Sequence, residues 1–142
     1  MNNKNKSNPQ SQKTLGTKGI IVLLVQGLIG WALCGSIIGI GRNITTMENT
    51  LIIHAVGVAL IFSMISWIYF RYFNFTTPLQ TAAVFVIFAV LMDLFVIATF
   101  VEKSYAMFAS VLGTWIPFAL IFLSTYLVGW IVNRSNRKLL IA

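Results

Sequence analysis

The chain has 142 residues, of which 58% are hydrophobic and 9% are charged, and its formal net charge is +7. Soluble domains carry roughly 25% charged residues, so this composition excludes an ordinary soluble fold. In a soluble protein the positive charge would suggest nucleic acid as a partner. Here the basic residues flank apolar stretches, and we expect the lipid bilayer as the partner and no nucleic acid.

Apolar stretches fill most of the sequence after residue 18. They cover approximately residues 19–40, 51–70, 78–101 and 105–132. Each is near the roughly 20 residues that a helix needs to cross a bilayer. The sequence therefore predicts an all-α membrane protein, with one membrane domain over residues 19–132 folded as an antiparallel up-down bundle of four transmembrane helices. We expect residues 1–18 to form a disordered basic tail and residues 133–142 a second basic tail, both cytoplasmic.

The distribution of basic residues predicts the orientation of the bundle. Eight of the ten lysines and arginines lie before the first span, between the second and third spans, or after the fourth. The other two, Arg42 and Lys103, lie in the remaining loops. Because loops rich in Lys and Arg stay in the cytoplasm, we expect both termini inside. The predicted location is the cell membrane, multi-pass, which is the cytoplasmic membrane if the organism is bacterial.

The first span contains small residues at a helical spacing. Gly27, Gly35 and Gly39 share one helix face with Trp31, and small residues on such a face allow two helices to approach closely. We interpret these glycines as helix-packing residues, either within this bundle or between two copies of the chain. Cys34 is the only cysteine, which excludes an intramolecular disulfide and paired-cysteine redox chemistry.

His54, near the start of the second span, is the only histidine. Imidazole titrates near neutral pH, so His54 is a candidate for proton exchange or for contact with a ligand. The alternative is an interfacial histidine that hydrogen-bonds a loop carbonyl. Glu48 precedes it in the loop and is expected at the outer surface.

Asp93 is a carboxylate inside the third span. We expect this span to begin at Pro78, because proline suits the first helical position. Asp93 then lies about 12 Å from the outer end of the helix. An ionisable residue at that depth is costly and marks a candidate functional site. We expect its side chain to face the bundle interior, since the other faces would expose a carboxylate to lipid.

The fourth span carries a proline in its predicted interior. Pro117 removes the hydrogen bond to the carbonyl of Gly113, which predicts a kink around Gly113. The freed carbonyls and Thr114 would lie at a depth comparable with Asp93. Before the span, Glu102 and Tyr105 are expected at the outer surface, with Glu102 in a solvated pair with Lys103 that contributes little stability.

Together these residues predict a polar cavity that opens outward. Its lining would include Asp93 and the unwound backbone from Gly113 to Pro117, with His54 as a further candidate, and no catalytic residue is identified. A haem held by two histidines is excluded by the single histidine. There is no Gly-rich phosphate loop and no ligand spacing typical of zinc, so we expect neither metal nor cofactor.

Three functions fit this pattern. The first, which we favour, is a non-enzymatic membrane protein in which Asp93 and the small-residue faces hold a structural or partner-binding bundle together, as a homo-oligomer or with a membrane partner protein. The second is a small proton- or ion-coupled transporter, or a channel-like oligomer, that uses Asp93. The third is a membrane enzyme that acts on lipid or quinone, with His54 and Asp93 as its acid–base pair.

Overall fold

All regular secondary structure in the part of the chain that the structure describes is helical. The computed structural model describes residues 16–141, so residues 1–15 of the predicted N-terminal tail and Ala142 lie outside the described residues. The long helices are α1 (Thr17–Ile44), α2 (Met47–Ile68), α3 (Pro78–Met92) and α4 (Ile116–Ile141). Shorter π-helical and 3₁₀ turns extend or precede them: η2 (Tyr69–Phe73), η3 (Asp93–Val101), η4 (Ala106–Ala109) and η5 (Val111–Trp115).

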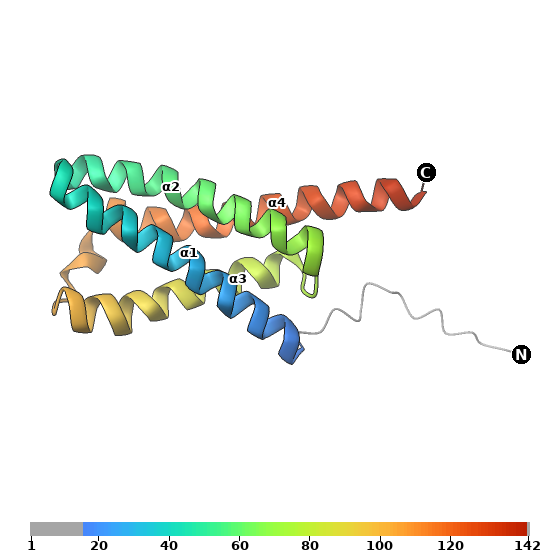
Figure 1. The fold of residues 1–142 in the computed structure, drawn as a ribbon, viewed down its shortest axis with the longest axis horizontal. Helices are drawn as coiled ribbons and strands as arrows, with labels where there is room; N and C mark the ends of the chain where they lie inside the picture. Colours follow the sequence, from blue (N-terminus) through green and yellow to red (C-terminus); the bar gives the residue numbers. More distant parts are fainter. Residues whose placement is uncertain (1–15, 142) are drawn as a thin grey trace, which may run out of the picture.

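With their π-helical extensions, four of these helices are long and apolar enough to cross a membrane. This confirms the prediction of an all-helical chain with four long apolar helices. Successive long helices run in opposite directions, and the start of α1 and the end of α4 lie at the same end of the bundle (Figure 1). We call the end that carries the α1–α2 loop the α1–α2 end, and the opposite end the α2–α3 end.

The last helix differs from the predicted fourth span at both of its ends. Residues 102–105 are bends, η4 follows, and Ser110 has an extended backbone (ψ 112°). Helical structure resumes at Val111 as a π-helical turn, and Pro117 is only the second residue of α4. The predicted continuous helix from residue 105 with a kink at Gly113 is therefore replaced by a break before Val111. At the other end, α4 continues to Ile141, so residues 133–141 are helical.

Local side-chain chemistry explains where this helix and α3 begin. The Ser110 hydroxyl accepts a hydrogen bond from the Gly113 N–H at 3.0 Å, which caps the new helix start. In α3, Pro78 is the first helical residue as predicted. Thr77 and Gln80 form a reciprocal capping box in front of it, because the side chain of each accepts a hydrogen bond from the backbone N–H of the other.

Buried aromatic side chains fill the middle and the α2–α3 end of the bundle. Phe62 of α2 and Phe85 of α3 meet edge to face, with ring centroids 5.5 Å apart. Tyr69, fully buried, shares a hydrogen bond of 2.8 Å with Thr76, and Thr76 shares one of 2.6 Å with Thr81. This hydroxyl chain satisfies polar groups that would be costly to bury alone.

Helices also approach closely at glycines in this packed region. A Cβ atom built on Gly129 would lie 2.5 Å from Cε2 of Phe70 and 2.9 Å from Cβ of Pro78. Phe70 is fully buried, so its ring has no free space into which to move. Gly129 therefore sets how closely α4 packs on the turn between α2 and α3.

We expect Gly129→Ala to destabilise the bundle by about 1–3 kcal/mol, because the added methyl overpacks a closed contact. Gly35→Ala is the matched control, since a Cβ atom at Gly35 would meet nothing within 4 Å. The measurement is the free energy of unfolding of the purified protein, titrated with sodium dodecyl sulfate in mixed micelles. Equal effects of the two substitutions would contradict this account of the packing.

Candidate functional site

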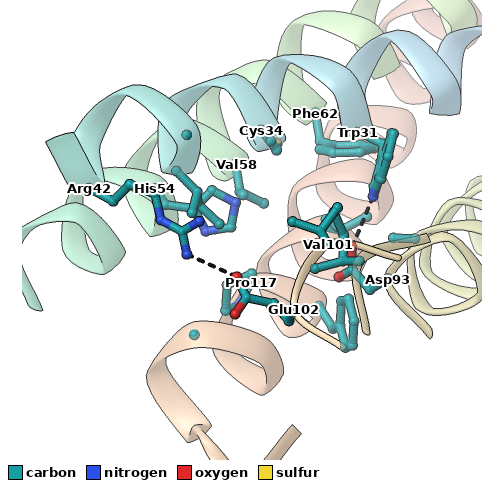
Figure 2. Close-up of a pocket in the computed structure, with 18 residues that line it drawn as sticks. Trp31, Cys34, Arg42, His54, Val58, Phe62, Asp93, Val101, Glu102 and Pro117 are labelled. Carbon is teal, nitrogen blue, oxygen red and sulfur yellow. Dashed lines mark hydrogen bonds and ion pairs between the residues drawn. The ribbon is translucent and has the colours of Figure 1, made fainter. Parts of the chain in front are cut away.

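A cavity of about 160 Å³ lies between the helices toward the α1–α2 end. Its walls come from α1, α2, α3 with its extension η3, and α4 with the preceding η5 (Figure 2). Most of the wall is apolar, including Val58, Phe62, Ile97, Phe118 and Ile121. The ionisable lining residues are Cys34, Arg42, His54, Asp93 and Glu102.

Asp93 faces this cavity and is held by a tryptophan from another helix. The indole Nε1–H of Trp31 in α1 donates a hydrogen bond to Oδ1 of Asp93 at a distance of 2.9 Å. Asp93 lies where α3 changes from α-helical to π-helical turns. Such π-helical turns shift the angular positions of the following residues and frequently occur at functional sites. The contact joins α1 to α3, and the side chain is only partly buried.

His54 of α2 lines the same cavity and is almost completely buried, at 6% exposure. Its Nδ1 atom is buried and has no hydrogen-bond partner among residues 16–141. The alternative predicted above was a hydrogen bond from His54 to a loop carbonyl, and Nδ1 makes no such bond in the described part of the chain. A buried polar atom without a partner is unusual in a folded protein and calls for an explanation.

The outermost charged residues of the cavity form an ion pair. Nη2 of Arg42, at the end of α1, lies 2.9 Å from Oε1 of Glu102, just after η3, and the two side chains are 37% and 40% exposed. Glu102 was expected to pair with its neighbour Lys103; the structure instead pairs it with Arg42. An exposed pair of this kind contributes about 0–1 kcal/mol, but it neutralises both charges beside the cavity (Figure 2).

The other predicted site residues fall into two groups. Gly113 and Pro117 line the cavity together with Asp93 and His54. Thr114 is buried, at 2% exposure, but is not among the lining residues. Glu48 and Tyr105 are exposed and also lie outside the cavity lining.

The glycines of α1 have different surroundings. Gly27 is buried, and a Cβ atom there would lie 3.1 Å from the ring of Phe88 in α3. Gly35 and Gly39 are exposed and line the cavity, and a Cβ atom at either would meet nothing within 4 Å. The expected packing of Gly35 and Gly39 within this bundle is therefore not found, because the cavity occupies the space beside them.

Sequence reasoning missed two of the contacts that define the site. Trp31 was placed on the glycine face but was not paired with Asp93. Arg42 and Glu102 were both assigned to the same side of the bundle, and that assignment was the available signal for their pairing. Nothing in the sequence indicated which charged or polar residues on one side would meet.

Comparison with models of protein families, with curated proteins and with solved structures finds no match for this chain.

We expect Trp31→Phe to lower the free energy of unfolding by about 1–3 kcal/mol, because it removes the donor and leaves a partly buried carboxyl without its partner. In an Asp93→Leu background the same substitution should cost much less, since there is then no acceptor to lose. Unfolding of all four proteins with sodium dodecyl sulfate in mixed micelles gives the coupling energy. Equal costs of Trp31→Phe in both backgrounds would show that this hydrogen bond contributes nothing.

Proposed function

We propose that this chain is a multi-pass protein of the cell membrane, with both termini in the cytoplasm. The length and apolar character of the four helices support a membrane location. Large apolar side chains cover their outer surfaces, including Leu60 at 63% exposure and Ile87 at 58%. A surface of this kind is unsuited to water but suited to lipid. The basic residues beyond the helix ends support the orientation.

Within the membrane, the function that the geometry supports best is a non-enzymatic bundle with a structural or partner-binding role. The hydrogen bond between Trp31 and Asp93 carries this proposal. In lipid no hydrophobic effect drives helices together, so polar contacts between helices contribute to their association and to its specificity. Asp93 is engaged in such a contact between α1 and α3. The occupant of the lipid-facing surface would be a second copy of the chain or a membrane partner protein.

A small proton- or ion-coupled transporter, or a channel-like oligomer, is the second candidate. The specific observation in its favour is that Asp93 and His54 line one cavity, so the carboxyl is not enclosed by protein on every side. A membrane enzyme acting on lipid or quinone is less well supported. It needs His54 and Asp93 as an acid–base pair, yet Nδ1 of His54 bonds to nothing in the described part of the chain.

The orientation predicts which positions react with a reagent that cannot cross the membrane. In a Cys34→Ala background, single cysteines at Glu48 and Lys103 should be labelled from outside intact cells. Cysteines at Lys13, Asn74 and Asn136 should be labelled only after the cells are permeabilised. Any other alternation would overturn the proposed topology.

Two substitutions of Asp93 separate the structural role from the alternatives. Asp93→Asn keeps an oxygen that can accept the Trp31 hydrogen bond, so the bundle should stay folded. Asp93→Leu removes the acceptor and should lower stability by about 1–3 kcal/mol. The measurements are thermal stability in lipid nanodiscs, and proton flux in proteoliposomes.

For a structural bundle, flux should be the same in wild type and Asp93→Asn. Loss of a proton-coupled flux in a folded Asp93→Asn protein would favour transport instead. Loss of a lipid or quinone product in that variant would favour the enzyme.

A further inference from the structure

The cavity at the α1–α2 end has the size of a small-ligand site. Its volume is about 160 Å³. An apolar cavity of roughly 150 Å³ is known to hold benzene. There is therefore room for a ligand whose apolar body is about one aromatic ring.

One of the carboxyl groups around the cavity has no ion-pair partner in the described part of the chain. Arg42 and Glu102 neutralise each other. Asp93 has no ion-pair partner among residues 16–141, and its partner there is the neutral indole of Trp31. An ionised carboxylate in apolar surroundings is costly unless a positive charge accompanies it. A cation is therefore the complementary ligand, although the chain as a whole is strongly basic.

The walls favour an organic cation over a metal ion. Calcium and magnesium ions require several oxygen ligands, and no group of three or more His, Cys, Asp or Glu residues gathers in the described part of the chain. Trp31, Phe62 and Phe118 instead bring aromatic rings to the lining. Aromatic faces attract organic ammonium ions through their quadrupoles, and they pack against the apolar body of such a ligand.

His54 contributes to the wall of the same cavity. It is nearly fully buried, and its ring lines the cavity (Figure 2). Its Nδ1 atom is enclosed by protein and has no partner within residues 16–141. The imidazole ring therefore adds to the wall of the cavity, and the charge contact is left to Asp93.

We propose that this cavity binds a small organic ammonium ion with an apolar body of about one ring. Asp93 pairs with the positive charge, and the aromatic and aliphatic walls pack against the apolar part of the ligand. This proposal goes beyond the structural role of Asp93 and does not depend on it. The hydrogen bond from Trp31 engages Oδ1 of Asp93, and Oδ2 is left for the ligand. The ammonium group has two available sources, a free amine or the headgroup of a lipid.

The first test compares benzylammonium with benzyl alcohol, which has nearly the same shape but no charge. Equilibrium dialysis of the purified full chain in nonionic micelles should show saturable binding of benzylammonium at one site. Benzyl alcohol should bind at least about tenfold more weakly, because it forms no ion pair with Asp93. Asp93→Asn should reduce benzylammonium binding by about the same factor and leave benzyl alcohol unchanged.

Glu48→Gln is the matched control, since it removes an exposed carboxylate that does not line the cavity. It should bind benzylammonium as the wild type does. The comparison of the two ligands on the unmodified protein needs no variant, so it decides the matter even if Asp93→Asn does not fold. Equal binding of the two ligands, no saturable binding, or an equal loss in Glu48→Gln and Asp93→Asn would overturn the proposal.

The second test distinguishes the two sources of the ammonium group. Benzylammonium binding is measured in nanodiscs of phosphatidylglycerol and in nanodiscs where phosphatidylethanolamine replaces half of that lipid. If the wild type binds benzylammonium more weakly in the mixed nanodiscs than in nanodiscs of phosphatidylglycerol alone, phosphatidylethanolamine competes for the cavity and the site is assigned to a lipid headgroup. Equal binding in both would assign it to a free amine. A failure of ligand binding leaves the stability effects of Asp93→Leu untouched, so the two proposals fail separately.

Discussion

The bundle depends on one carboxylate that α3 carries among apolar residues. Such a group is costly without a hydrogen-bond partner. Asp93 accepts a hydrogen bond at Oδ1 from the indole Nε1–H of Trp31 on α1, and the two atoms are 2.9 Å apart. This contact fixes two helices that are distant in the sequence. The contact also lies at the point where α3 changes to the π-helical turns of η3. The position of the carboxyl group therefore depends on the helix geometry at this point.

The break before α4 gives the cavity its remaining wall. The chain bends over residues 102–105 and enters the last long helix only at Val111, after the short turn η4. Glu102 there pairs with Arg42, and η5 and α4 contribute Gly113 and Pro117 to the lining. A continuous helix from residue 105 would place these groups differently. The hydroxyl of Ser110 stabilises the start of the helix at Val111, since it accepts a hydrogen bond from the Gly113 N–H, which the break would otherwise leave unpaired.

The cavity combines features that a purely packed core lacks. Its lining includes a carboxyl without an ionic partner in the described residues, aromatic rings, and His54, whose buried Nδ1 atom has no hydrogen bond within residues 16–141. Each of these is costly or neutral for folding taken alone. Their presence around one cavity is the reason to consider a ligand in addition to a structural role for Asp93.

The helical class, the number of long apolar helices and the start of α3 at Pro78 could be predicted from the sequence, because helix length, apolar composition and proline geometry are local properties. It also singled out Asp93 and His54, since ionisable residues in apolar stretches are conspicuous. Three features required the folded chain: the contact of Trp31 with Asp93, the pairing of Glu102 with Arg42 where Lys103 was expected, and the position of Gly35 and Gly39 beside a cavity. These outcomes depend on how the helices are rotated and separated, which a local pattern does not encode.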